Sequence, residues 1–206
     1  AAGNFGGASA AAEGYARQRP GMFEALSLAG DAALANNAPL VAQDYYRRAA
    51  QVRFPDRMLL RTVEALEKSG RGREAPALVL SYASAWPASR LAVRMAAGHA
   101  AYAGDWAHSR SLLEHLAYSG GGARDGRLLV DLSLAQLNSG DAESARDTAQ
   151  RAARLLPASS VAAQAWGMAL VELDEDPDLA RQLLDKARRI DGDNPLLATA
   201  RKRLGK

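Results

Sequence analysis

The chain repeats a pattern about every 34 residues, and this period constrains its fold more than any other feature. Turn signals recur at steps of 33, 34, 36 and 35 residues, at Asn37, Gly70, Gly104, Gly140 and Glu175. Such a period indicates an array of similar supersecondary units, each of which buries its core by stacking on its neighbours. Such an array can extend as one continuous body, so the chain length does not require two domains.

Fixed offsets from these turns carry small or apolar side chains. Five residues after each turn stands a small residue: Ala42, Ala75, Ser109, Ala145 and Ala180. Nine and twelve residues after the turns stand Tyr46, Val79, Leu113, Ala149 and Leu184, then Ala49, Tyr82, Leu116, Ala152 and Ala187. These spacings place the three positions on one face of a helix, and the small residue lets a second helix approach closely.

The segment before each turn follows a similar rule. Eleven residues before stand Leu26, Leu59, Val93 and Leu129, with Gln164 departing from the pattern, and seven before stand Gly30, Val63, Ala97, Ser133 and Met168. No stretch alternates apolar and polar residues for long enough to predict a strand. The sequence therefore predicts an all-α chain of helix, tight turn, helix and looser turn, repeated.

This period and pattern resemble the tetratricopeptide repeat family, whose unit is about 34 residues in two antiparallel helices. The resemblance covers about Phe23 to Asn194 and is clearest in Val93–Leu116 and Leu129–Pro157. It implies a right-handed α-solenoid of about five antiparallel helix pairs with a C-terminal capping helix. The expected repeats are 23–55, 56–89, 90–125, 126–159 and 160–194.

The sequence departs from the family pattern at three places. The large aromatic expected early in the first helix is an aliphatic residue here. The third repeat ends in Gly120-Gly121-Gly122 instead of a proline, which we interpret as an elongated loop between repeats. The fifth repeat is out of register by about one residue at its turn, near Glu175.

The two ends differ from the repeats. Residues 1–21 are rich in Ala and Gly, and we predict a flexible lead-in with a short helical piece near Ser9–Arg19, stopped by Pro20-Gly21. Residues 195–206 are expected to form a capping helix with a basic tail, Arg201–Arg203. Because the chain lacks an initiator Met and the features of a signal peptide, we expect a processed form or a piece of a longer protein.

The resemblance also implies a partner-binding groove, because the family's concave surface is lined mainly by the first helix of each repeat. The matching positions are Arg57, Leu60, Arg61, Glu64, Arg94, Met95, Gly98, Tyr102, Arg127, Val130, Leu134, Asn138, Gln164 and Met168. We expect a protein or peptide partner held by apolar anchors and by arginines that bind its carboxylates.

One partner class of the family is not expected. Some members bind an acidic C-terminal chaperone peptide through a clamp of Lys and Asn side chains, but Ser27, Asp31, Leu91 and Met95 stand at the matching places here.

The sequence offers no pattern typical of catalysis, a cofactor or a metal site. There is no Cys, and His99, His108 and His115 have no accompanying ligand motif. Ser119–Gly126 is rich in Gly but lacks the Lys-Ser/Thr of a phosphate loop. We therefore expect neither enzyme activity nor a bound cofactor or metal.

Charge and hydropathy bear on the partners and the cellular location that we expect for the chain. Its 26 basic and 23 acidic residues are spread along the sequence, so nucleic acid is not an expected partner. No apolar run reaches the roughly 20 residues that span a bilayer. We expect a soluble chain, either periplasmic at the cell envelope or cytoplasmic, and the Ala- and Arg-rich composition suggests a bacterium in which it serves assembly, export or envelope processes.

Two alternatives to a free scaffold stay open. The chain could be the non-catalytic recognition arm of a larger enzyme or secretion protein, or a self-assembling structural piece. A polar capping helix opposes open-ended stacking, so the sequence favours a monomer.

Overall fold

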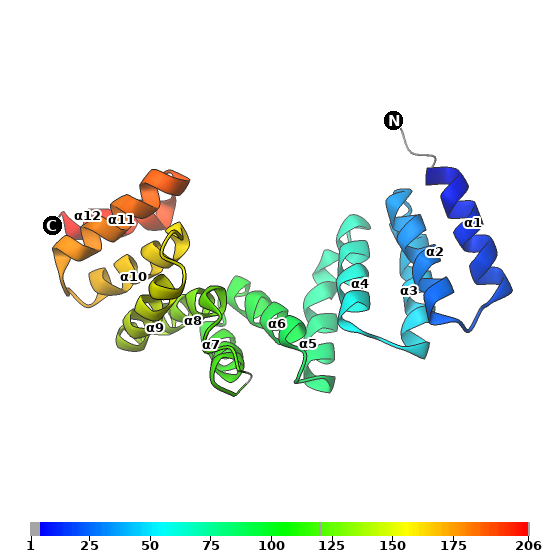
Figure 1. The fold of residues 1–206 in the computed structure, drawn as a ribbon, viewed down its shortest axis with the longest axis horizontal. Helices are drawn as coiled ribbons and strands as arrows, with labels where there is room; N and C mark the ends of the chain where they lie inside the picture. Colours follow the sequence, from blue (N-terminus) through cyan, green and yellow to red (C-terminus); the bar gives the residue numbers. More distant parts are fainter. Residues whose placement is uncertain (1–4, 120, 206) are drawn as a thin grey trace. The chain divides into compact units, whose positions relative to one another are not determined.

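The computed structural model describes residues 5–119 and 121–205, and the regular elements in these ranges are helical (Figure 1). The α-helices are α1 Phe5–Gln18, α2 Phe23–Ala35, α3 Pro39–Val52, α4 Asp56–Lys68, α5 Ala75–Ala85, α6 Arg90–Tyr102, α7 Trp106–Glu114, α8 Gly126–Asn138, α9 Ala142–Leu155, α10 Ser160–Glu172, α11 Pro177–Asp191 and α12 Pro195–Leu204. A short 3₁₀ turn, Gly72–Glu74, precedes α5, and a π-helical turn, His115–Ser119, follows α7. The all-α prediction is confirmed.

The chain divides into an N-terminal unit, Ala1–Ala92, and a C-terminal unit, Val93–Lys206. In the N-terminal unit, α1 packs on α2, α2 on α3, and α3 on α4. In the C-terminal unit, α8 packs on α9 and α10 on α11, while α12 contacts both α10 and α11. Even-numbered helices from α2 to α10 are the first helices of the predicted repeats, and odd-numbered helices from α3 to α11 are the second.

The offsets read from the sequence identify the buried face of every second helix. All fifteen positions that stand five, nine and twelve residues after the turn signals are buried. Close contact between paired helices depends on small residues opposite them. A Cβ atom added at Gly30 would lie 2.4 Å from Cε1 of Tyr46, and one added at Gly167 would lie 2.9 Å from Cδ2 of Leu184. The predicted tight pairing of helices is confirmed.

Each tight turn uses the same backbone device. A residue with a positive φ follows each first helix: Asn37 at 56°, Gly70 at 78°, Gly104 at 81°, Gly140 at 88° and Asp174 at 53°. The fifth turn has a second such residue, Asp176 at 37°. In each turn, the residue after the first positive-φ residue donates its backbone N–H to the carbonyl five positions earlier, in hydrogen bonds of 2.8 to 3.0 Å. This bond satisfies a carbonyl at the helix end and reverses the chain direction, which makes each pair antiparallel.

The backbone geometry of the fifth turn accounts for the register shift near Glu175. The positive φ lies at Asp174, one residue earlier than the sequence alignment assumed, and Asp176 then caps α11 by accepting a hydrogen bond from the Leu179 N–H. Counted from Asp174, the first-helix positions are Ala163 and Gly167, which are both buried. Gln164 and Met168, which the resemblance placed in the groove, are half-buried.

The N-terminal segment also differs from the prediction. Helix α1 begins at Phe5, earlier than the expected helical piece, and lies beside α2 (Figure 1). Its Ala12 and Ala16 belong to the core that α2, α3 and Met58 form. Residues 5–18 are thus an integral helix, because alanines spaced four apart give it a narrow face for close packing. Residues 1–4 of the expected flexible lead-in lie outside the described residues.

The predicted C-terminal helix is present as α12. Asn194 caps it by accepting a hydrogen bond from the Leu197 N–H at 2.9 Å. Leu197 and Ala200 are buried against α10 and α11, whereas Leu196 is 58% exposed. The last helix therefore closes the C-terminal core on one side and leaves Leu196 at the surface.

The contact between Gly30 and Tyr46 gives a test of the helix pairing. We expect Gly30→Ala to destabilise the protein by about 1–3 kcal/mol, because the added methyl group would overlap the buried Tyr46 ring. The control is Gly14→Ala in α1, where the added atom meets only the end of the Arg17 side chain at 4.0 Å. We expect that change to stabilise by up to about 1 kcal/mol. Urea unfolding followed by circular dichroism measures both, and equal effects would contradict the close pairing.

Candidate partner-binding surfaces

The first helices line a hollow in each unit. The N-terminal hollow has a volume of about 430 Å³ and is lined by Phe23, Glu24, Ser27, Leu28, Asp31, Arg53, Pro55, Arg57, Met58 and Arg61. The C-terminal hollow has a volume of about 370 Å³ and is lined by Arg94, Ala97, Gly98, Ala101, Trp106, Ser109, Leu113, Asp131, Leu134, Asn138, Met168 and Leu196. Five of the ten residues that line the first hollow are charged, whereas the second hollow is lined mainly by apolar side chains.

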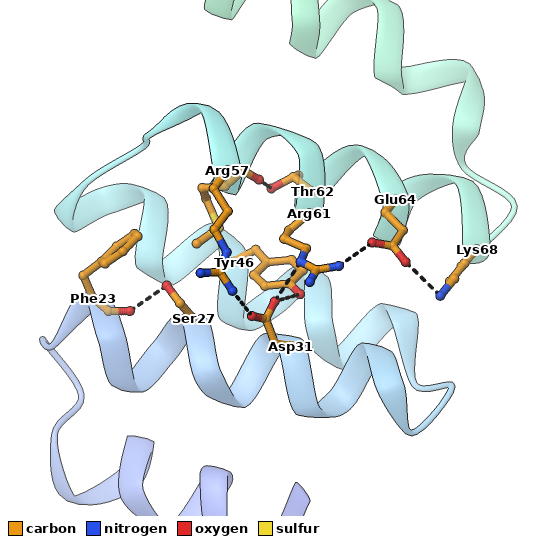
Figure 2. Close-up of polar contacts among 10 residues, drawn as sticks. Phe23, Ser27, Asp31, Tyr46, Arg57, Arg61, Thr62, Glu64 and Lys68 are labelled. Carbon is orange, nitrogen blue, oxygen red and sulfur yellow. Dashed lines mark hydrogen bonds and ion pairs between the residues drawn. The ribbon is translucent and has the colours of Figure 1, made fainter. Parts of the chain in front are cut away.

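Asp31 is the centre of the polar contacts in the N-terminal hollow (Figure 2). Its Oδ1 accepts a hydrogen bond from the Tyr46 hydroxyl at 2.8 Å and lies 3.2 Å from Nε of Arg61. Its Oδ2 accepts from Arg57 at 3.1 Å. These contacts join α2, α3 and α4, so the charged residues hold neighbouring helices of the unit in place as well as lining a surface.

The network continues along α4 with alternating charges (Figure 2). Arg61 donates to Glu64 at 2.8 Å, and the Lys68 ammonium lies 2.9 Å from the other Glu64 oxygen. The hydrogen bonds from Lys68 and Arg61 lower the pKa of Glu64. Arg61 is therefore held by two carboxylates of the chain itself.

Tyr46 is fully buried beneath this network, in the space that Gly30 leaves free. Its burial and its hydrogen bond to the Asp31 carboxylate raise the pKa of the Tyr46 phenol above its ordinary value of 10.0. The phenol consequently stays protonated as a donor to Asp31, and the position of Asp31 depends on the core of the first repeat.

The C-terminal hollow is built from α6, α7, α8, α10 and α12. Gly98 is exposed, and a Cβ atom added there would meet nothing within 4 Å, so the surface is open at that point. Leu134 and Met168 are half-buried and Leu196 is 58% exposed. Exposed apolar side chains gathered around one hollow are typical of a surface that contacts another molecule.

Arg94 does not reach into this hollow as a free cation. Its Nη2 and Nε donate to Oδ2 of Asp131 at 2.7 and 3.0 Å, and its Nη1 lies 3.8 Å from Asp125. The pair with Asp131 links α6 to α8. In the unbound chain the Arg94 guanidinium is paired with Asp131 on the next first helix, so Arg94 would have to leave this pair to bind a partner carboxylate.

The other predicted groove residues fall into several groups. A neighbouring hollow of about 380 Å³ shares Arg94 and Asp131 and includes Arg127 and Val130. Another, of about 470 Å³, combines Arg57 and Arg61 with Leu60 and Glu64. The C-terminal hollow brings together five predicted residues, Arg94, Gly98, Leu134, Asn138 and Met168.

Three predicted residues lie outside these hollows. Tyr102 is 95% exposed at the end of α6, and Met95 is half-buried on the same helix. The Gln164 side chain accepts a hydrogen bond from Asn194 at 3.0 Å. Gln164 therefore helps to position the start of α12.

Sequence reasoning missed the residues that come from outside the first helices. Arg53 lies in the connection between α3 and α4, and Trp106 opens the second helix α7. Offsets within first helices could not select them. The spacing of four residues between Arg53, Arg57 and Arg61 is a sequence signal that could have added Arg53 to the predicted Arg57 and Arg61.

Two further features concern chemistry and membranes. Among residues 5–119 and 121–205, no three His, Asp or Glu side chains are grouped to hold a metal ion. His108 donates its backbone N–H to the Asp105 side chain at a helix start. Within the same described ranges, no helix has the length and apolar character needed to cross a bilayer.

Several solved structures resemble the chain at low sequence identity. The C-terminal part of a TPR repeat-containing protein from Cytophaga hutchinsonii has a TM-score of 0.69 and 11% identity, over 90% of this chain and 74% of that one. MamA (41-end) from Desulfovibrio magneticus RS-1 has a TM-score of 0.64 and 18% identity, over 93% and 99%. No protein-family model and no curated protein matches the sequence.

A third similar structure is the APC/C hetero-tetramer Cut9–Hcn1, with a TM-score of 0.66 and 13% identity. The match covers 98% of this chain but 40% of that one, so this chain spans less than half of its length. These likenesses show that the chain has the tetratricopeptide-repeat fold, as the sequence pattern predicted.

The buried phenol of Tyr46 predicts a specific dependence of stability on pH. Below pH 10, Tyr46→Phe should cost about 1–2 kcal/mol through the lost hydrogen bond to Asp31. Above pH 10, the unfolded chain loses the Tyr46 proton while the folded chain keeps it, because the folded pKa is raised. The native protein therefore loses stability relative to the Phe variant by about 1.4 kcal/mol per pH unit.

Urea unfolding of both proteins between about pH 8 and about pH 11 measures this difference, since the remaining tyrosines titrate alike in the two chains. A gap in unfolding free energy that narrows above pH 10 supports the buried phenol. A gap that stays constant would contradict it.

Proposed function

We propose that the chain is a protein-interaction scaffold that holds an apolar segment of a partner protein in the C-terminal hollow. The observation that carries this proposal is the convergence of Gly98, Leu134, Met168 and Leu196 from four different helices on one open, mainly apolar hollow. An apolar surface patch of this kind is costly to leave in water, and contact with a partner removes that cost.

The geometry favours a polypeptide segment over a deeply buried small molecule. Leu196 is more than half exposed, so the apolar wall extends onto the open surface. Gly98 presents bare backbone, which lets another chain approach α6 closely. The Met168 side chain can adjust to partners of different shape because it is unbranched and flexible.

The polar rim would set the direction of the bound segment. Asn138 lines one side and donates its side-chain amide to the Leu134 carbonyl at 2.7 Å, which leaves its amide oxygen for a partner N–H. On another side stands the Arg94–Asp131 pair, whose two residues also line the hollow. Few, well-placed polar groups around an apolar centre are typical of specific interfaces.

The comparison with Cut9–Hcn1 supports a scaffold role, since that structure is a hetero-tetramer of two kinds of protein. The composition, rich in Ala and Arg, favours a bacterial setting in assembly, export or envelope processes.

A matched pair of substitutions tests this site. The probes are peptides selected from a random phage library for binding to the native chain. We expect Leu196→Glu to weaken their binding by about tenfold or more, because the new charge would be buried against the bound segment. Ile190→Glu on α11 is the control, since Ile190 is 52% exposed and does not line the hollow. Fluorescence anisotropy measures both affinities, with circular dichroism as the check on folding. Equal affinities for the two variants would contradict the proposal.

A further inference from the structure

Three arginines lie four residues apart along one side of the N-terminal hollow. Arg53 precedes α4, and Arg57 and Arg61 lie on α4. Their partners across the hollow are Glu24 and Asp31 on α2. The hollow therefore has three guanidinium groups along one edge and two carboxylates along the other.

The three arginines are held to different extents. Arg61 contacts both Asp31 and Glu64, so its role is to join helices. Arg57 makes one contact, to Asp31 at 3.1 Å, and its side chain is 77% exposed. Arg53 contacts Glu24 at 3.1 Å, and both of those side chains are 60% exposed. The exposed pair of Arg53 and Glu24 contributes little to stability, so a ligand can replace it at little cost.

Asp31 keeps two of its three partners when Arg57 leaves it. Its Oδ1 keeps the Tyr46 hydroxyl and the Arg61 guanidinium when Arg57 turns toward a ligand. Glu24 is exposed and regains water when Arg53 leaves it. Each guanidinium has five N–H donors in a planar fork that fits a carboxylate through paired hydrogen bonds.

The charge of the whole unit points to the same class of ligand. Residues 1–92 contain eleven basic and eight acidic side chains, whereas residues 93–206 contain fifteen of each. The net charge of +3 thus belongs entirely to the N-terminal unit. A unit of this charge attracts acidic partners over distances of about 10 Å at moderate salt.

The hollow also has an apolar wall beside the arginines. Phe23 and Met58 line it, and Leu28 is 52% exposed there. The Arg53 guanidinium lies 4.2 Å from the centre of the Phe23 ring, which orients it toward the hollow. A bare inorganic anion would leave this wall in water, but a peptide can cover it.

From these contacts we propose that the N-terminal hollow binds an acidic segment of a partner protein. Arg53 and Arg57 receive two carboxylates of the segment, and a neighbouring apolar side chain lies against Phe23 and Leu28. This site differs in chemistry from the C-terminal hollow, and neither depends on the other.

The test uses a short acetylated and amidated peptide in which Asp and Glu alternate with Leu, and its analogue with Asn and Gln. Fluorescence anisotropy on the full chain should show at least about tenfold tighter binding of the acidic peptide, with affinity falling as salt rises. Arg53→Gln with Arg57→Gln should abolish this preference. The control, Arg47→Gln with Arg73→Gln, removes the same charge outside the hollow and should leave affinity within about twofold.

A third variant should gain affinity, which a misfolded protein would not do. Glu24→Gln frees Arg53 from its internal partner, so the acidic peptide should bind several-fold more tightly. The proposal is overturned if the two peptides bind equally, if the control pair loses as much as the test pair, or if millimolar inorganic phosphate displaces the acidic peptide. Leu196→Glu should leave binding of the acidic peptide unchanged. This variant separates a failure of the N-terminal site from a failure of the C-terminal site.

Discussion

The close approach of two helices within each repeat is the constraint on which the structure depends. A side chain at Gly30 would overlap the Tyr46 ring, and one at Gly167 would overlap Leu184. The second helices meet this contact with small residues of their own, such as Ala42 and Ala180, which are fully buried. Close contact of this kind gains dispersion energy over many atom pairs without large apolar side chains, which suits a chain rich in Ala and poor in aromatics.

This pairing decides which side chains are left for function. Once the second helix covers one face of the first, the opposite face of the first helix is open to partners. The positions six residues before each positive-φ residue are Asp31, Glu64, Gly98, Leu134 and Met168. The first two carry charges in the N-terminal unit, and the last three line the apolar hollow of the C-terminal unit. One backbone geometry thus presents two kinds of surface, and the difference lies only in the side chains.

Much of the fold followed from the sequence because the repeat period reports packing directly. Positions such as Ala145 and Leu184 had to be buried for a second helix to dock, and they are. The turn near Glu175 was placed one residue late, because Asp174 adopts a positive φ without being a glycine. Helix α1 was underestimated since its glycines reduce helix propensity, while its contact with α2 compensates for them.

The candidate sites were less predictable than the fold. The period selects a face of each first helix, so it found Gly98, Leu134 and Met168. The period could not show that the Asp131 carboxylate pairs with the Arg94 guanidinium, because that contact joins residues 37 positions apart on different helices. It also could not find Arg53 or Trp106, whose places depend on how connections and second helices fold against the first helices.

The four methionines provide the most direct measurement of the central claim that the open face of the first helices binds partners. Met168 lines the C-terminal hollow and Met58 the N-terminal hollow, while Met22 and Met95 lie outside both. In a spectrum of the chain with ¹³C-methyl methionine, titration with a library-selected peptide should shift the Met168 signal and leave those of Met22 and Met95 in place. A bound peptide that shifts neither the Met168 nor the Met58 signal, or that shifts the Met95 signal instead, would contradict the account.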